Sequence, residues 1–207
     1  MLRLESFAVG PLSCNCSLLW DPEKATGVVV DPGGEGKRIA RRVQELGFTV
    51  QAILQTHAHF DHVGASRELQ ELWQCPTRLH EGDGHLIENL DMQTGMFGMK
   101  SIPKPETEHV PHGDRRHELT TLHTPGHTPG SCCFHGDFEL GKLVLSGDTL
   151  FQGGVGRTDL WGGSWAQLED SIRRHLYTLE PGTLVIPGHG PSTTIGEEAE
   201  ENPFVRT

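Results

Sequence analysis

Residues 56–62 read THAHFDH, and this stretch decides how the rest of the chain is interpreted. It places three histidines and an aspartate within six consecutive positions. One histidine is usually satisfied by an ordinary hydrogen bond, but three beside a carboxylate are typical of a metal site. Side chains alternate along an extended segment, so His57 and His59 point the same way and can chelate one ion. Asp61 and His62 follow where the chain turns, and they can face a second ion.

The segments around this cluster predict a mixed α and β chain. CSLLWD (16–21) and TGVVVDPGG (26–34) read as strands, and GKRIARRVQELG (36–47) reads as a helix that stops at Gly47. VQAILQT (50–56) reads as a buried strand that runs directly into the histidines. A helix with Ala65, Leu69 and Leu72 along one face is expected after them. The cluster therefore lies at the carboxyl end of a strand, where α/β sheets usually place ligand sites.

Three further polar residues repeat this setting, each in a glycine-rich turn after an expected strand. They are His127 in HTPGHTPGS, Asp148 in VLSGDTLF and His189 in VIPGHGP. Together with the cluster they make five histidines and two carboxylates, a ligand set for two metals with one carboxylate free to bridge. Nitrogen and oxygen ligands without thiolate suit zinc, with iron or manganese as alternatives. We therefore expect two divalent metal ions, zinc first.

Composition narrows the class of protein. A chain of 207 residues fits one domain over residues 1–207, and its formal net charge of −11 argues against a nucleic-acid surface. The sequence contains no run of about 18 apolar residues, which a membrane span would need, so no membrane partner is expected. The start, MLRLESFAVGPLSCN, lacks the pattern of a signal peptide, which favours a cytoplasmic location. We expect a small-molecule substrate and a monomer or homodimer.

The five cysteines include no Cys-x-x-Cys pair, and their number is odd. This fits neither a disulfide framework nor a thiolate zinc site, so we interpret them as reduced residues of the core. Cys14 and Cys16 would share a strand face, which leaves a two-thiolate site as the lesser alternative.

Two helices are expected in the C-terminal third. SWAQLEDSIRRHLYTLEPG (164–182) begins with a capping box of Ser164 and Gln167 and carries a leucine-rich stripe of core residues. TTIGEEAEENPF (193–204) begins a shorter helix with a second capping box, Thr194 and Glu197.

These motifs resemble those of the metallo-β-lactamase superfamily of binuclear hydrolases. The match to the pattern T-H-x-H-x-D-H is complete, and His127, Asp148 and His189 follow at similar intervals. The segments HTPGHTPGS, SGDTLFQGGVGRTDL and PGHGPSTTIGEE look like those of short glyoxalase II-like hydrolases. The resemblance covers nearly the whole chain.

The resemblance implies an α+β fold, a four-layer αββα sandwich, and a division of the ligands. One metal would take His57, His59 and His127, the other Asp61, His62 and His189, and Asp148 would bridge them. A metal-bridging hydroxide would attack a thioester carbonyl, and Asp61 would also orient the attacking water as a catalytic residue. A thioester such as S-lactoylglutathione is the expected substrate.

Substrate recognition is less well specified. The chain ends 18 residues after His189, so we expect it to lack the C-terminal helical domain with which full-length glyoxalase II enzymes bind glutathione. Arg157 in GGVGRTD is the candidate for gripping a substrate carboxylate or amide, and a loop brace with Asp159 is the alternative. Asp31 either hydrogen-bonds a ligand histidine or shapes the DPGG turn. A methionine-rich group is interpreted as buried packing, with a pocket mouth as the alternative: Met92, Met96, Phe97 and Met99.

Several alternatives remain at this point. Persulfide dioxygenases look similar, also carry a GRTD stretch, and bind one iron through the equivalents of His57, His127 and Asp148. Their last motif typically reads AHDY where this chain has GHGP, which favours the hydrolase. Lactonase or β-lactamase activity is a third option, nuclease activity is the least favoured, and a purely structural metal would not need seven ligands. Of the other histidines, His123 is considered as support for a ligand, and ordinary surface or hydrogen-bonded roles are expected for the rest: His80, His85, His109, His112, His117, His135 and His175.

Overall fold

The computed structural model describes residues 1–206, and in this range the strands form two six-stranded sheets and a small ribbon. The first sheet is antiparallel from β1 to β3 and parallel from β3 to β6. Its strands in spatial order are β1 (Arg3–Val9), β2 (Cys14–Asp21), β3 (Thr26–Val30), β4 (Thr49–Leu54), β5 (Thr77–Leu79) and β6 (Thr107–His109). The edge strand β1 and the short strands β5 and β6 are the elements of this sheet that the motifs above did not predict.

The second sheet is antiparallel except where β10 pairs with β13. Its strands in spatial order are β14 (Thr193–Thr194), β13 (Leu184–Pro187), β10 (Gly141–Gly147), β9 (Cys132–Phe138), β8 (Leu119–His123) and β7 (Arg115–Arg116). The ribbon joins β11 (Leu150–Phe151) to β12 (Gly154–Val155).

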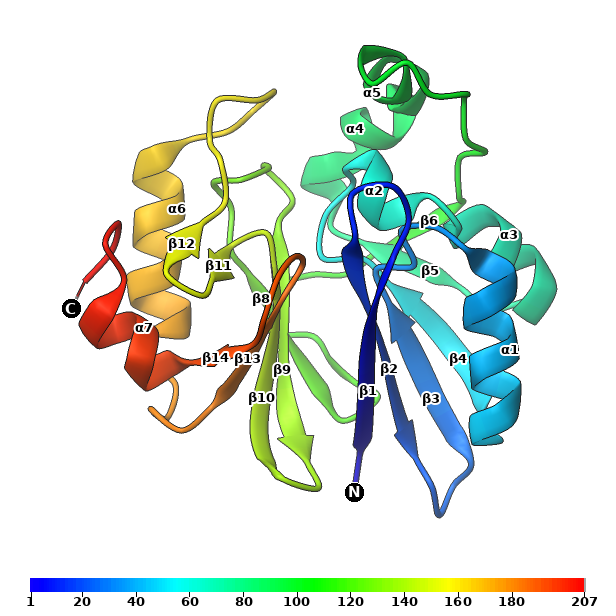
Figure 1. Cartoon of the computed structure of the whole chain (residues 1–207), viewed down its shortest axis with the longest axis horizontal. Helices are drawn as coiled ribbons and strands as arrows, with labels where there is room; N and C mark the ends of the chain where they lie inside the picture. The colour runs from blue at the N-terminus through cyan, green and yellow to red at the C-terminus, as the bar shows by residue number, and fades with distance from the viewer. Residues whose placement is uncertain (207) are drawn as a thin grey trace.

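Helices cover both outer faces of the paired sheets (Figure 1). On the first sheet lie α1 (Gly36–Leu46) and α3 (Ser66–Trp73), and on the second lie α6 (Trp165–Ser171), the π-helical segment η2 (Ile172–Leu176) and α7 (Ile195–Glu201). A third group of short helices gathers at one end of the sandwich: α2 (Phe60–Val63), the 3₁₀ turn η1 (Glu81–Asp83), α4 (Gly84–Glu88) and α5 (Leu90–Met96). The predicted α+β fold with αββα layers is confirmed.

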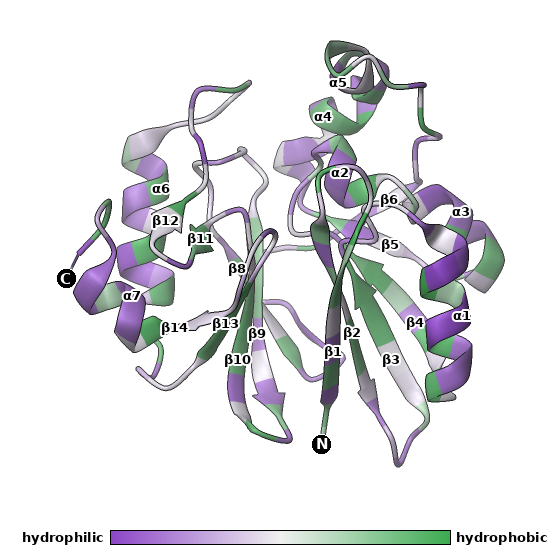
Figure 2. Ribbon diagram, viewed as in Figure 1, coloured by the Kyte–Doolittle hydropathy of each residue, from purple (hydrophilic) through white to green (hydrophobic). Residues whose placement is uncertain are grey.

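Apolar residues are concentrated on the strands of both sheets (Figure 2), and their side chains pack in the space between the layers. Between the two sheets, Val30 and Leu54 of the first pack in one cluster with Phe134 and Leu145 of the second. Each helical layer buries its own stripe against a sheet, because the apolar residues of its helices recur at a spacing of three and four. The predicted stripe of the C-terminal helix is such a case, with fully buried Leu168, Ile172 and Leu176 and a partly buried Leu179.

Three helix boundaries follow the sequence signals. Gly47 ends α1 at a φ of +73°, Ser164 accepts a hydrogen bond at the start of α6, and Thr194 forms the capping box of α7. Leu72 had been expected on the buried face of the helix after the histidines, but its side chain is 60 % exposed. That expectation was wrong because the face of α3 turned to the core runs through Ser66, Leu69 and Trp73, which leaves Leu72 to one side of it. Within residues 1–206, no helix has the length and hydrophobicity that a membrane span requires.

The sandwich brings distant strand ends to one edge. Strands β4, β10 and β13 all end at the edge near α2, at the top of Figure 1. The residues that follow them begin the segments with His57, Asp148 and His189. The polar turns of the sequence thus share one end of the molecule.

Candidate metal centre

All seven predicted ligands lie together at this end of the sandwich. Three overlapping groups have ligand atoms that all lie within 4.8 Å of one another: His57, His59 and His127; His57, His62 and Asp148; and Asp61, His62 and His189. The first and third groups match the two metal positions expected from the sequence. The middle group joins them.

The first group is built by two loops. His57 and His59 follow β4 and point to the same side, as alternation in an extended segment requires. The Nδ1 of His59 lies 3.1 Å from His57 Nε2 and 2.9 Å from His127 Nε2. Three ring nitrogens therefore meet at one point.

The second group combines α2 with the turn after β13. His189 Nε2 lies 3.1 Å from Asp61 Oδ2 and 3.3 Å from His62 Nε2. Gly188 is needed beside it, because a Cβ there would lie 2.2 Å from Asp148 Oδ1. The glycine lets the backbone before His189 lie directly against the Asp148 carboxylate.

Hydrogen bonds fix which nitrogen of each ring keeps its lone pair. Four Nδ1 atoms face oxygens: His57 faces Thr56 Oγ1 at 3.1 Å, His62 faces Asp31 Oδ2 at 2.9 Å, His127 faces the Arg157 carbonyl at 2.7 Å, and His189 faces the Leu12 carbonyl at 3.1 Å. A neutral imidazole that donates from Nδ1 has an unprotonated Nε2. In their neutral form the four rings would therefore aim their Nε2 lone pairs at the shared centre. Burial opposes protonation, but Cys14 and the facing carboxylates raise the pKa of His62, and Asp61 and Asp148 raise the pKa of His189, so a bound cation would take the place of a proton at these two rings.

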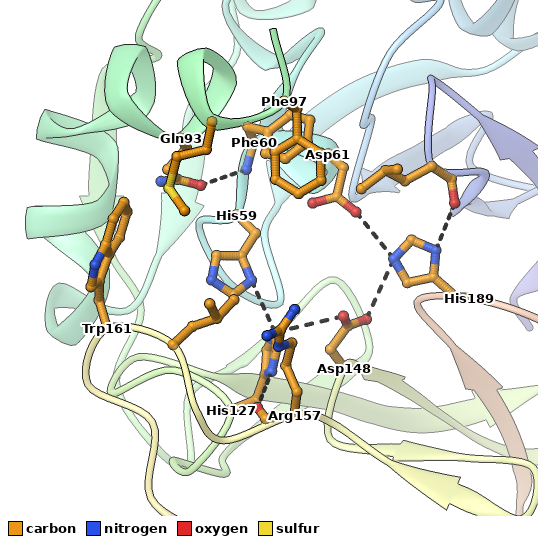
Figure 3. A pocket seen from close by; sticks show the side chains of 13 residues that line it. His59, Phe60, Asp61, Gln93, Phe97, His127, Asp148, Arg157, Trp161 and His189 are labelled. Carbon is orange, nitrogen blue, oxygen red and sulfur yellow. Dashed lines mark hydrogen bonds and ion pairs between the residues drawn. The ribbon is translucent and has the colours of Figure 1, made fainter. Parts of the chain in front are cut away.

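Asp148 lies between the two groups (Figure 3). Its Oδ1 is 3.4 Å from His62 Nε2 and 3.8 Å from His189 Nε2, and its Oδ2 is 3.6 Å from His127 Nε2. Burial would raise the pKa of Asp148, but these three histidines outweigh that effect and hold the pKa below its usual range. The carboxylate is therefore anionic.

These residues fit divalent cations. Burial lowers the pKa of His57, and the neighbouring imidazoles lower it further, so that ring is neutral and can donate its lone pair. Among the buried side-chain nitrogen and oxygen atoms of residues 1–206, Asp148 Oδ1 is one of the few that have no hydrogen-bond partner. Converging lone pairs and an unpaired carboxylate oxygen call for positive charge at this point.

A cavity of about 300 Å³ opens onto the centre (Figure 3). His59, Asp61, Asp148 and His189 form its polar side. The apolar part of the lining comes from four separate segments, with the residues Leu12, Phe60, Met96, Phe97, Leu160 and Trp161. The centre can therefore hold a small molecule that combines a polar reacting group with an apolar part.

The sequence identified this lining only in part. Met96 and Phe97 line the cavity, and Met99 packs against the buried cluster beneath α4 and α5, so each interpretation of the methionine-rich group holds for part of it. Met92 is 52 % exposed and fits neither interpretation. Leu12 and Trp161 were missed. Their only signal was a large apolar side chain inside a glycine-containing turn, GPLS and LWGG, where exposure is otherwise expected.

Three supporting residues take definite roles. Asp31 has both proposed roles, because it accepts from His62 and also turns the chain at a φ of +49°. Arg157 lines the cavity, but its guanidinium makes two bonds to Asp159, at 2.7 and 2.8 Å, as the brace interpretation expects. His123 was considered as support for a ligand, and this was wrong: its Nε2 donates to the Pro129 carbonyl and its ring stacks on His80.

Five other histidines form a group that the sequence did not predict, which we call the second histidine cluster. The ring centroids of His80 and His123 are 3.8 Å apart, those of His80 and His109 are 5.1 Å apart, and those of His112 and His175 are also 5.1 Å apart. The backbone N–H of His123 donates to His112 and so links the group of three rings to the pair of His112 and His175. The ordinary hydrogen-bonded role expected from the sequence is seen for His80, His109 and His112, whose Nδ1 atoms accept backbone N–H groups.

Comparisons with known proteins agree with this geometry. The family model described as the metallo-beta-lactamase superfamily matches residues 9–189. The chain is 42 % identical to the probable metallo-hydrolase YqgX of Bacillus subtilis, over 99 % of this chain and 98 % of that protein. It is 38 % identical to the hydroxyacylglutathione hydrolase GloC of Haemophilus influenzae, over 100 % of this chain and 99 % of that protein.

Solved structures are similar over nearly the whole fold. The crystal structure of TTHA1623 in a di-iron-bound form has a TM-score of 0.88 and 40 % identity, and the match covers 97 % of this chain and all of that one. ETHE1 from Myxococcus xanthus has a TM-score of 0.79 and 31 % identity, with 97 % of this chain and 83 % of that one covered.

Proposed function

The chain belongs to the metallo-beta-lactamase superfamily, and on that premise we propose that it is a binuclear metallohydrolase that cleaves thioesters. The observation that carries the proposal is the position of Asp148, whose two oxygens face one nitrogen-rich group each. A carboxylate so placed can serve two cations at once. The similarity to the hydroxyacylglutathione hydrolase GloC supports S-lactoylglutathione as the first substrate to test.

We assign the ligands as the geometry groups them. His57, His59 and His127 would hold one ion, and Asp61, His62 and His189 the other. His59 would bind through Nδ1 and the other histidines through Nε2, because those are the nitrogens that face the centre. Zinc is the first candidate, and iron is supported by the di-iron form of TTHA1623; manganese also suits these ligands.

Thioester hydrolysis would use the bound cations, Asp61 and the apolar lining of the cavity. Two bound cations would lower the pKa of a shared water toward neutrality and supply positive charge to a carbonyl oxygen. Asp61 would accept a hydrogen bond from that water and turn its lone pair toward the substrate. The apolar lining would keep other water away from the acyl group. A thiolate leaving group needs little protonation, because a free thiol has a pKa of about 8.5.

The proposed setting is a small-molecule reaction in the reducing cytoplasm. All five cysteines are buried free thiols, which supports a compartment in which they stay reduced. Arg157 is the proposed contact for a substrate carboxylate, in competition with its partner Asp159.

The test combines metal content with turnover of S-lactoylglutathione, on protein purified without chelator or added metal. We expect close to two metals per chain and hydrolysis that is lost on dialysis against a chelator and restored by metal. A single iron per chain, oxygen uptake with glutathione persulfide and little hydrolysis would instead identify a persulfide dioxygenase, the alternative suggested by the shared stretch from Gly156 to Asp159. Two bound metals without thioester hydrolysis would withdraw the substrate class but keep the metal centre.

A further inference from the structure

The loop that carries His57 and His59 is held by side chains from other segments. Three alternate backbone N–H groups, of Thr56, Ala58 and Phe60, donate to Asp31 Oδ1 at 2.8 Å, Asp83 Oδ2 at 3.0 Å and Gln93 Oε1 at 2.9 Å, respectively. The residues between them point their side chains into the metal centre. The exact path of this loop, and so the direction of its histidines, depends on three buried polar side chains.

Of these three side chains, Asp83 is the one that accepts hydrogen bonds from two loops of the metal centre. It ends the turn η1 and has no exposed surface. Besides Ala58, its carboxylate accepts from Thr128 Oγ1 at 2.8 Å and from the Gly130 backbone at 2.6 Å. Thr128 directly follows His127, so a single carboxylate ties the His57–His59 loop to the loop that carries His127.

The fit around this carboxylate is close. A Cβ on Gly130 would lie 2.7 Å from Asp83 Cγ, and a Cβ on Gly82 would lie 2.8 Å from the Pro129 carbonyl oxygen. The two backbones can approach this closely because both positions are glycine. Burial raises the pKa of Asp83, and the bonds from Thr128, Ala58 and Gly130 oppose that rise. The carboxylate accepts three hydrogen bonds and makes no salt bridge within residues 1–206, although the nearby His85 also lowers its pKa. Asp83 therefore connects the two loops through hydrogen bonds and not as half of an ion pair.

We propose that Asp83 is a positioning residue for the metal position of His57, His59 and His127. The proposal rests on the ligand assignment of the proposed function. Asp83 does not touch the metal; it fixes the distance between the two loops whose nitrogens must meet at one point. Residues that orient metal ligands in this way typically change metal affinity by about 10- to 100-fold when they are substituted.

Asp31 provides a contrast within the same chain. It accepts from His62 Nδ1 and from the hydroxyl of Thr56, and Thr56 in turn receives the bond from His57 Nδ1. Asp31 therefore supports a histidine of each metal position. Asp83 supports only the first.

The experiment titrates Co²⁺ into chelator-treated protein and follows the two binding steps by calorimetry. His127→Ala and His189→Ala identify the step that belongs to each position. We expect Asp83→Asn to weaken the step lost in His127→Ala about 10- to 100-fold and to leave the step lost in His189→Ala unchanged. The side-chain amide of Asp83→Asn has one acceptor oxygen fewer than the carboxylate, and its NH₂ group would face the backbone N–H of Ala58 or of Gly130. We expect Asp31→Asn to weaken both steps.

Circular dichroism and thermal melting check that each variant folds. If Asp83→Asn does not fold, Thr128→Val keeps the carboxylate and removes one of its three bonds, and we expect a several-fold weakening of the same single step. Unchanged binding in the folded variants, or equal weakening of both steps, would overturn the proposal. Fewer than two steps in the unsubstituted protein would instead overturn the binuclear function, which separates the two failures.

Discussion

The metal centre and the second histidine cluster each bring five imidazoles together, and ring spacing does not tell them apart. Centroids of His57 and His59 are 4.8 Å apart, and those of His80 and His123 are 3.8 Å apart. The difference lies in what the Nδ1 atoms contact. In the metal centre four of them face oxygens, so each donates a proton and leaves Nε2 with a lone pair.

In the second cluster the direction of the bonds is reversed. The Nδ1 atoms of His80, His109 and His112 accept backbone N–H groups, from Gly82 at 3.2 Å, Glu81 at 3.1 Å and His123 at 3.1 Å. A neutral ring that accepts at Nδ1 carries its proton on Nε2 and cannot bind a cation there. Crowded histidines therefore indicate a metal site only when their other nitrogens face acceptors.

The largest predicted difference between the two clusters is in metal content and catalysis. We expect His59→Ala to lose metal from the first position and to reduce thioester hydrolysis on the order of 10³-fold, because the charge that stabilises the reacting oxygen is removed. Its matched variant is His175→Gln, in the second cluster, for which we expect unchanged metal content and turnover. Elemental analysis measures the metal content of both variants, and steady-state kinetics measures their thioester hydrolysis. Metal loss from His175→Gln would show that the hydrogen-bond criterion does not separate the clusters.

The residues of the metal centre could be found from the sequence because each one sits in a local pattern. A strand end with a glycine directly before a polar residue recurs at Asp148 and His189, and alternation alone places His57 beside His59. The two-sheet topology then brings these strand ends to one edge. The αββα layers themselves came from the resemblance that the motifs carry, and not from periodicity.

Local sequence patterns could not identify the second histidine cluster or the hydrogen bonds that hold the loop of His57 and His59. His80, His109, His123 and His175 lie at the ends of β5, β6 and β8 and in η2, and no local pattern connects them. Asp83 lies among residues 80–116, where the sequence pattern is weak. Its partners are 25 to 47 positions away, and a carboxylate that accepts backbone N–H groups has no sequence signature.

A smaller effect is expected in the pH dependence of stability. Burial, with the nearby rings of His123 and His109, lowers the pKa of His80 to about 4, although Glu81 acts in the opposite direction. The unfolded chain takes up a proton near pH 6.5 and the folded one only near pH 4, so stability is complete above pH 6.5 and falls as the pH drops toward 4. We expect a contribution of about 1 kcal/mol, since the ring is only partly buried and solvent screens its charge.

His80→Asn tests this contribution, because the amide oxygen can still accept from Gly82 but does not titrate. Melting curves of metal-loaded protein between pH 7 and 4 should show a smaller loss of stability in the variant than in the unsubstituted chain. His85→Asn, on the exposed side of α4, should follow the unsubstituted chain. Parallel curves for all three proteins would mean that the second cluster is not held neutral by the fold.

The smallest predicted effect concerns Arg157, whose two parts belong to different regions. Its main-chain carbonyl accepts from His127 and so supports the metal centre, while its guanidinium is exposed and paired with Asp159. Arg157→Ala keeps the carbonyl, so metal content should not change, and an exposed contact with a substrate carboxylate is worth only a two- to fivefold rise in KM, roughly, for S-lactoylglutathione. Asp159→Asn frees the guanidinium and should lower KM by a similar factor. If Asp159→Asn also raises KM, the pair acts as a brace of the cavity loop, and the substrate contact must come from elsewhere in the lining.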